Sequence, residues 1–322
     1  MIRGKINPKY FPVLVTGVLF VSLFIVGSLQ FSSFGSSRVF FNLFTDNAFL
    51  AITAIGMTFV ILSGGIDLSV GALIALSGVL CSVLIEKFSW HPLQAFPVVI
   101  MFGSLFGASM GALIHYYKIQ AFIVTLAGMF FARGLATIIS EQSIPIGHGF
   151  YESINGFGFM LPGRAWIGVA TLSLIVVLVF SVWLAHFTRF GGYVYAIGGN
   201  KQSAQLMGVP VGRTTIYIYV LSSTFAALAG IIFSLYTSSG YALAASGLEL
   251  DAIAAVVIGG TLLTGGTGYV YGTILGVLIM GSIQTYISFH GGLNSWWTKI
   301  VIGSLVLVFI ALQKFIGSGR SA

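Results

Sequence analysis

The sequence predicts an all-α integral membrane protein with about ten transmembrane helices. Hydrophobic residues make up 57% of the 322 residues and charged residues only 7%, whereas about a quarter of the residues in an ordinary soluble domain are charged. Apolar runs recur along the whole chain, and about 20 apolar residues cross a hydrocarbon layer about 30 Å thick. Basic residues stand singly between these runs, so we attribute the net charge of +7 to membrane topology and expect no nucleic-acid partner. We therefore expect residues 1–322 to form one transmembrane domain in the lipid bilayer.

The apolar runs place the crossings in order along the chain. The first, at residues 11–30, is longer than the apolar core of a signal peptide, so we expect it to stay attached as a helix. Polar or glycine-rich breaks separate the others, which fall at 45–62, 70–85, 94–117, 121–139, 165–187, 214–238, 251–263, 269–289 and 297–313. Because the run at 251–263 is short and flanked by glycines, counts from nine to eleven fit the pattern.

The distribution of basic residues orients the predicted helices. Ten crossings that start from a cytoplasmic N-terminus place most of the positive charge inside, as the positive-inside rule requires. The predicted cytoplasmic segments are residues 1–10, 188–213 and 314–322, and the predicted periplasmic loop is 140–164. Both termini are thus expected in the cytoplasm.

Glycines mark the predicted breaks and the close helix contacts. Residues 54–78 and 252–276 both begin Ala-Ile, run through an apolar segment, break at paired glycines and resume as a helix. This likeness indicates either a parallel internal repeat, as in some transporter folds, or a chance similarity between apolar segments. Gly103, Gly107 and Gly111 recur at every fourth position and predict a helix face that another backbone can approach closely.

Residues 62–71, Leu-Ser-Gly-Gly-Ile-Asp-Leu-Ser-Val-Gly, predict a broken helix because polar groups and glycines interrupt an apolar pattern. Asp67 is expected to cap the following helix by accepting from the backbone N–H of Ser69 or Val70. Non-helical backbone at membrane depth is tolerated only where protein buries it or where it lines a wet cavity. Asp67 and Ser69 are therefore also candidates to line a translocation path, and both interpretations stay open.

Other polar residues lie in or near apolar runs, where unpaired polar atoms are costly. We expect each of them either to line the path or to make a hydrogen bond between helices; they are Asp46, Asn47, Gln284 and Tyr286. Arg133 is predicted to snorkel outward or to pair with a carboxylate such as Asp46.

The connection at 188–213 contains a predicted short surface helix. Asn200 is a good N-cap, Gly208 a good C-terminal stop, and Pro210 prevents continuation of the helix. This helix is either a solvated linker or the docking surface for a soluble partner. The candidate docking residues are Asn200, Lys201, Gln202, Ala204, Leu206, Met207 and Gly208.

The glycine-rich segment at 259–268 does not predict nucleotide binding. It lacks the Gly-Lys-Ser/Thr ending of a phosphate-binding loop. The five histidines are dispersed without metal-ligand spacing, and no serine, histidine and acid set is evident. We therefore expect no cofactor or metal in this chain and no enzymatic activity of its own.

Several segments resemble the ribose-type family of monosaccharide importer permeases: residues 63–71, 122–129 with 133–135, 198–200 and 249–268. Within that family the chain looks closest to the permeases of the galactofuranose importer. That likeness lies in Arg38, 45–50, 236–244 and 295–300. The whole resemblance spans about residues 40–312.

The resemblance implies a permease subunit of an ATP-binding-cassette importer that carries a monosaccharide, galactofuranose, across the bacterial inner membrane. It implies a second, related but different permease chain, an ATPase subunit that binds ATP and Mg, and a periplasmic sugar-binding protein. The alternative is a self-sufficient, ion-coupled secondary sugar transporter. Buried acids are few for such a mechanism, since Asp67 and Asp251 are both explicable as helix caps.

Overall fold

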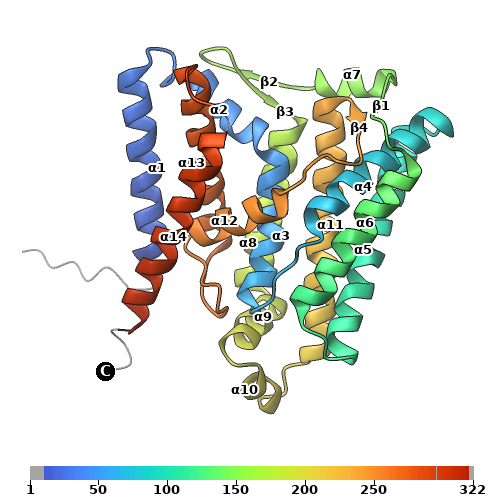
Figure 1. Cartoon of the computed structure of the whole chain (residues 1–322), viewed down its shortest axis with the longest axis vertical. Helices are drawn as coiled ribbons and strands as arrows, with labels where there is room; N and C mark the ends of the chain where they lie inside the picture. Colours follow the sequence, from blue (N-terminus) through green and yellow to red (C-terminus); the bar gives the residue numbers. More distant parts are fainter. Residues whose placement is uncertain (1–10, 295, 319–322) are drawn as a thin grey trace, which may run out of the picture.

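The computed structural model describes residues 11–294 and 296–318, and most of them are helical (Figure 1). The predicted cytoplasmic N-terminus at 1–10 lies outside the described residues, as do Ser295 and the last four residues of the predicted C-terminal segment. Long helices run roughly side by side between two ends of the molecule (Figure 1). We call these the α7 end and the α10 end after the short helices found there.

Within the described residues, seven helices are long and apolar enough to cross a membrane. One of the seven is α4 (Val70–Ser82) continued by the π-helix η1 (Val83–Lys87). The others are α1 (Phe11–Gln30), α5 (Pro92–Tyr116), α6 (Ala121–Ile139), α8 (Val169–Phe187), α11 (Val211–Thr237) and α13 (Val270–His290). The pair α2 (Ser37–Asp46) and α3 (Ala48–Leu62), bent by 56°, makes an eighth if it counts as one span. The all-α membrane class is confirmed, whereas the count of ten is not.

Two predicted crossings account for the difference in the count. The run at 251–263 forms α12 (Leu248–Ile258), whose 11 residues reach only about 16 Å at the rise of an α-helix. The predicted crossing there is too short to span the membrane as a helix, and the chain before it, residues 238–247, is not helical. The last run lies in α14 (Trp296–Ser318). Its apolar part, Trp296–Ala311, is shorter than the seven spanning helices.

The predicted periplasmic loop at 140–164 is an ordered cap at the α7 end. It contains α7 (Gly149–Asn155), and its strand β1 (Ile144–Pro145) pairs antiparallel with β4 (Ser239–Gly240). A hairpin joins β2 (Gly158–Leu161) to β3 (Ala165–Gly168). The Glu86 carboxylate accepts a hydrogen bond from the Gly147 N–H at 2.8 Å. Residues near 86 and 239 therefore lie at the same end of the molecule as this loop.

The predicted glycine stripe packs α5 directly against α11. A Cβ atom on Gly103 would lie 2.5 Å from Ala227 Cβ, and one on Gly111 would lie 2.8 Å from Ile216 Cα. A Cβ on Gly107 would overlap the Tyr219 carbonyl oxygen. The prediction of a close helix contact is confirmed, since only glycine permits this approach.

The two segments with the repeat-like pattern, 54–78 and 252–276, both run as helix, break and helix. Their breaks touch each other at the α10 end, where the Gly266 N–H donates to the Leu62 carbonyl at 2.8 Å. The parallel repeat itself stays a prediction.

Candidate functional site

The first interrupted pass is closed by the carboxylate of Asp67. This residue is fully buried and accepts from the Ser69 N–H at 3.0 Å and from the Ser69 hydroxyl at 2.6 Å. The expected turn is confirmed, although α4 begins at Val70 with Ser69, not Asp67, in the N-cap position. The second partner, which no sequence pattern indicated, is the Ser222 hydroxyl of α11, which donates to the other Asp67 oxygen at 2.8 Å. Neither Asp67 nor Ser69 lines either of the polar cavities described below.

The second interrupted pass, residues 238–247, runs alongside α4 and therefore lies at membrane depth. A Cβ on Gly240 would overlap the Gly78 carbonyl oxygen, and a Cβ on Gly71 would lie 2.8 Å from the Ala245 carbonyl oxygen. The helix α4 thus extends along this non-helical segment from position 78 to position 71. Figure 1 shows the segment between β4 and α12 descending from the α7 end to mid-height.

Arg133 of α6 supplies hydrogen-bond donors to this non-helical segment. One of its guanidinium nitrogens, Nη1, donates to the carbonyl of Ala242 at 2.6 Å and to that of Ala244 at 2.7 Å. The predicted pairing with Asp46 is wrong; the carboxylate whose charge acts on Arg133 is Glu249. These carbonyls have no helical hydrogen-bond partners, so at this depth they need another donor, which the guanidinium supplies.

The same pass is partly exposed on the outer surface of the chain. Tyr241 and Leu243 keep 38% and 55% of their surface accessible. Beside it, Lys299 of α14 forms an ion pair with Asp251 of α12 at 2.6 Å. The expectation that Asp251 acts as a helix cap is wrong, because the N-cap of α12 is Gly247 and no side chain caps it. An exposed non-helical segment and an ion pair beside it are both unfavourable against lipid at this depth.

A polar cavity of about 550 Å³ opens next to this surface. It brings together Asp46, Asn47 and Gln284, three of the predicted path residues, from α2, the bend after α2, and α13. Its other lining residues include Asn42, Phe49, Tyr236, Leu248, Asp251, Thr285, Ser288 and Phe289. Tyr286 is not among them, because its hydroxyl points to α1 and donates to the Gln30 side chain.

The cavity offers both kinds of contact that a sugar uses, polar groups for its hydroxyls and aromatic rings for its apolar faces. The Asn47 amide is held by the Leu43 carbonyl at 2.9 Å, and the Tyr236 hydroxyl lies 3.5 Å from Asp46 Oδ1. In the described part of the chain the exposed Gln284 amide makes no side-chain hydrogen bond. Gln284 is therefore the amide most available to a solute.

At the opposite end, the predicted short helix is present as α10 (Lys201–Leu206), which follows α9 (Arg189–Gly199). Asn200 caps it by accepting from the Ser203 N–H at 2.8 Å, and Gly208 has the positive φ of 83° that suits a helix stop. Leu206 and Met207 are exposed by 89% and 72%.

Not every residue nominated for docking lies on the surface of α10. Ala204 is fully buried and packs with Ile197 of α9 and Val211 of α11. It therefore holds α10 against its neighbours, whereas the exposed Lys201, Gln202 and Leu206 can meet a partner.

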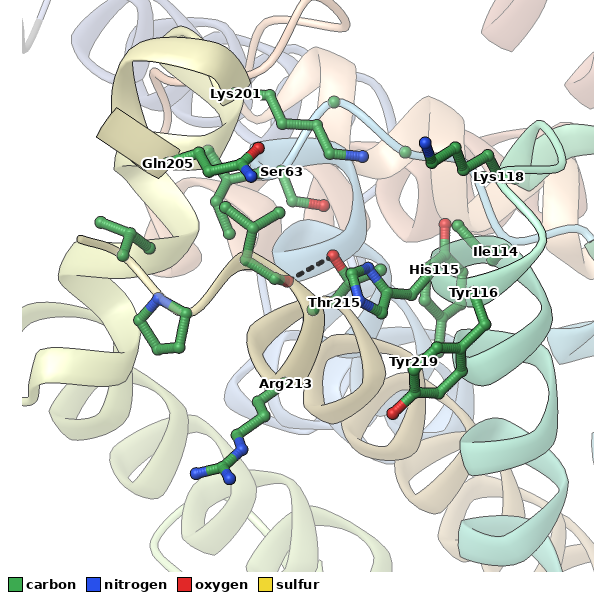
Figure 2. A pocket seen from close by; sticks show the side chains of 18 of the residues that line it. Ser63, Ile114, His115, Tyr116, Lys118, Lys201, Gln205, Arg213, Thr215 and Tyr219 are labelled. Carbon is green, nitrogen blue, oxygen red and sulfur yellow. Dashed lines mark hydrogen bonds between the residues drawn. The ribbon is translucent and has the colours of Figure 1, made fainter. Parts of the chain in front are cut away.

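A second cavity, of about 910 Å³, separates α10 from the turn between α5 and α6 (Figure 2). Lys118, Lys201 and Arg213 line it, and among the described lining residues there is no Asp or Glu. Figure 2 shows Lys118 and Lys201 on opposite sides of the cavity with their amino groups directed toward each other. Two positive charges therefore face each other across this space. The open volume between them leaves room for α10 and the α5–α6 turn to move relative to each other.

Comparison with known proteins agrees with the membrane architecture. The profile of the family described as "Branched-chain amino acid transport system / permease component" matches residues 39–310. The inner membrane ABC transporter permease protein YjfF of Escherichia coli is 56% identical over 94% of this chain and 92% of its own length.

The names of two further relatives include a sugar. The fructose import permease protein FruG of Bifidobacterium longum is 40% identical over 96% of this chain and 92% of its own length. The ribose import permease protein RbsC of Escherichia coli is 38% identical over 92% and 91%. The chain therefore belongs to this family of transport permeases, among its ribose-type ATP-binding-cassette members.

Proposed function

We propose that this chain is the permease of an importer that carries a monosaccharide, galactofuranose, across the bacterial inner membrane. The observation that carries the proposal is the polar cavity beside Gln284, with its amides, carboxylates, hydroxyls and aromatic rings. A sugar needs such a mixed lining, since its hydroxyls require partners while its ring carbons pack on aromatic surfaces. Relatives named for ribose and fructose support a sugar as cargo.

The choice of galactofuranose depends on where the resembling segments meet. Asp46 and Asn47 belong to the segment 45–50, and Tyr236 to the segment 236–244; all three line the cavity. Lys299, from the segment 295–300, pairs with Asp251, which also lines it. The residues that carry the likeness to galactofuranose permeases thus converge on one cavity.

A second permease chain is the proposed neighbour of the exposed, non-helical pass. Lipid cannot satisfy the backbone of residues 238–247, so protein or water has to cover it. A related but different permease on this face encloses a wet path, which the cavity enters from the α7 end. The alternative cover, water alone, is incompatible with the surrounding bilayer.

The α10 end is the proposed cytoplasmic side, and both chain termini are proposed to be cytoplasmic. Lys118, Lys201 and Arg213 line the cavity beside α10, and Arg189 begins the adjoining α9. Glu86, in contrast, accepts from Gly147 in the cap at the α7 end, and Glu152 lies in α7 itself. A partner ATPase that binds ATP and Mg docks on α10, and a periplasmic sugar-binding protein delivers the sugar at the α7 end. The chain's sequence has no nucleotide-binding motif, so the partner supplies the hydrolysis.

Uptake by the assembled complex in vesicles tests this function. Labelled galactofuranose should enter only with ATP, and ribose should compete poorly. Gln284→Ala should reduce uptake about tenfold, because a hydrogen bond left unmade in a polar site costs ~1–2 kcal/mol. Tyr286→Phe, two residues further on the same helix and outside the cavity, is the matched control and should transport normally.

Two results would overturn the proposal. Uptake driven by an ion gradient in the absence of ATP would favour the secondary transporter instead. Equal uptake by wild type and Gln284→Ala would remove the cavity from the path.

A further inference from the structure

Three glycine pairs that are far apart in the sequence meet at the α10 end. They are Gly64–Gly65 after α3, Gly198–Gly199 at the end of α9, and Gly265–Gly266 in the loop before α13. A Cβ on Gly198 would overlap the Leu62 carbonyl oxygen and would lie 2.5 Å from the Gly266 nitrogen. A Cβ on Gly265 would lie 2.8 Å from the Gly64 nitrogen, and one on Gly266 would lie 2.8 Å from the Gly199 nitrogen. Three backbones are therefore in direct contact, with no side chain between them.

Hydrogen bonds reinforce this glycine junction. The Gly266 N–H donates to the Leu62 carbonyl at 2.8 Å, and the Tyr195 hydroxyl of α9 donates to the Gly268 carbonyl at 2.8 Å. Burial raises the pKa of the Tyr195 phenol, so this hydroxyl keeps the proton that it donates. The end of α9 is thus joined to the first interrupted pass through Leu62, and to the loop at 259–268, which connects through α12 to the second interrupted pass.

The other side of α9 and α10 is not packed in this way. The cavity of about 910 Å³ lies between α10 and the turn that joins α5 to α6. Lys118 and Lys201 face each other across it (Figure 2). A displacement of α10 can widen or narrow this cavity without a steric clash. The end of α9, in contrast, cannot shift relative to Leu62 and Gly266 without separating backbones that are in contact.

We infer that Gly198 and Tyr195 are positioning residues that couple α10 to the two interrupted passes. Movement imposed on α10 is passed through the glycine junction to α3 and to the loop before α13. The helices α5 and α6 do not move with α10, so the width of the cavity between Lys118 and Lys201 changes. The inference rests on the proposed docking of the ATPase on α10 and names the route by which that docking reaches the translocation path.

Gly198→Ala tests the junction because its new methyl group must push α9 away from Leu62. We expect the variant to bind the ATPase and to hydrolyse ATP while sugar carried per ATP hydrolysed falls about tenfold. Gly192→Ala is the matched control: it lies in the same helix, gains the same helical propensity, and finds no heavy atom within 4 Å of its Cβ. It should transport like the wild type.

Tyr195→Phe is a second test of the junction, which is needed if the Gly198→Ala complex fails to assemble. It removes one hydroxyl and should lower the sugar-to-ATP ratio about threefold. Tyr193→Phe, whose hydroxyl has no hydrogen bond in the described structure, should leave the ratio unchanged. Full coupling in an assembled Gly198→Ala complex, or an unchanged ratio in Tyr195→Phe, would overturn the role of the junction.

A docking variant separates this inference from the proposed function. Leu206→Asp places a charge on the most exposed apolar residue of α10 and should prevent co-purification of the ATPase. If the ATPase still binds Leu206→Asp normally, the docking proposal fails. If it is lost there but Gly198→Ala stays fully coupled, docking stands and the junction does not carry the movement.

Discussion

The two interrupted passes satisfy non-helical backbone at membrane depth in different ways. In the first, residues 63–69, the segment supplies its own carboxylate, and Asp67 is fully buried against Ser69 and Ser222. In the second, residues 238–247, Arg133 of α6 donates to two of the carbonyls, β4 pairs with β1, and the segment stays partly exposed. The first pass is closed around one buried carboxylate that belongs to the segment itself, whereas two carbonyls of the second pass are satisfied by one long side chain from α6.

This difference indicates which pass is structural and which can meet a substrate. A buried carboxylate with three donors leaves little room for a solute or for rearrangement. A charged side chain that bridges two carbonyls beside an exposed surface can exchange partners more easily. We therefore expect substitutions at Arg133 to affect both stability and transport, and those at Asp67 to act through stability.

The largest effect is expected from Arg133→Met, which keeps an unbranched apolar stem and removes the guanidinium donors. Two carbonyls at membrane depth then lose charge-assisted hydrogen bonds, so the free energy of unfolding should fall by about 3 kcal/mol. Denaturation in mixed detergent and SDS micelles, followed by tryptophan fluorescence, measures this change. Arg133→Lys should recover part of the loss.

Arg213→Met is the control for loss of an arginine as such. Arg213 is exposed at the α10 end and makes no hydrogen bond to the described residues, so its replacement should change stability by less than about 0.5 kcal/mol. Equal stability of Arg133→Met and the control would show that the second pass does not need this donor, and the contrast between the two passes would disappear.

An intermediate effect is expected at Asp67, where two substitutions distinguish a structural from a path-lining charge. Asp67→Ala leaves the Ser69 N–H and two hydroxyls without their acceptor and should cost about 2 kcal/mol. Asp67→Asn keeps an acceptor for Ser69, and its amide can donate to Ser222, so the cost should be about 1 kcal/mol.

Sugar uptake, normalised to the amount of assembled complex, completes this comparison. Asp67→Asn should transport, because the carboxylate lines neither of the two polar cavities. A normally assembled Asp67→Asn complex without uptake would mean that the charge itself serves transport. The first pass would then belong to the path as much as the second.

The sequence predicted the first break and missed the second for a physical reason. Asp67 and Ser69 are two residues apart, so a local turn motif contains the whole interaction. Arg133 is 109 residues from Ala242, and Ser222 is 155 residues from Asp67. Contacts between such distant residues depend on helix packing, which an apolar pattern does not specify.

The candidate path residues show a similar limit. Asp46, Asn47 and Gln284 were selected as path candidates because they are polar residues in or near apolar runs, and all three line one cavity. Their place in the translocation path stays a prediction. Tyr286 was grouped with them, but two helical residues turn the side chain by about 200°. Gln284 and Tyr286 therefore face opposite sides of α13, and only the rotation of that helix in the fold decides which one meets the cavity.

The smallest expected effect comes from the neighbouring serines 222 and 223 of α11, which are both fully buried. The Ser222 hydroxyl donates to Asp67, whereas the Ser223 hydroxyl has no partner among the described residues. Ser222→Ala should therefore cost about 1 kcal/mol, and Ser223→Ala should be neutral or slightly stabilising because it removes an unsatisfied polar group. The same detergent titration measures both, and a double-mutant cycle of Ser222→Ala with Asp67→Asn isolates the pair.

If the two alanine variants lose the same stability, the cost belongs to the packing of α11, and Asp67 is held by its local turn alone. A coupling of about 0.5–1 kcal/mol between positions 67 and 222 would instead show that the first pass is fastened to α11, while the second is fastened to α6.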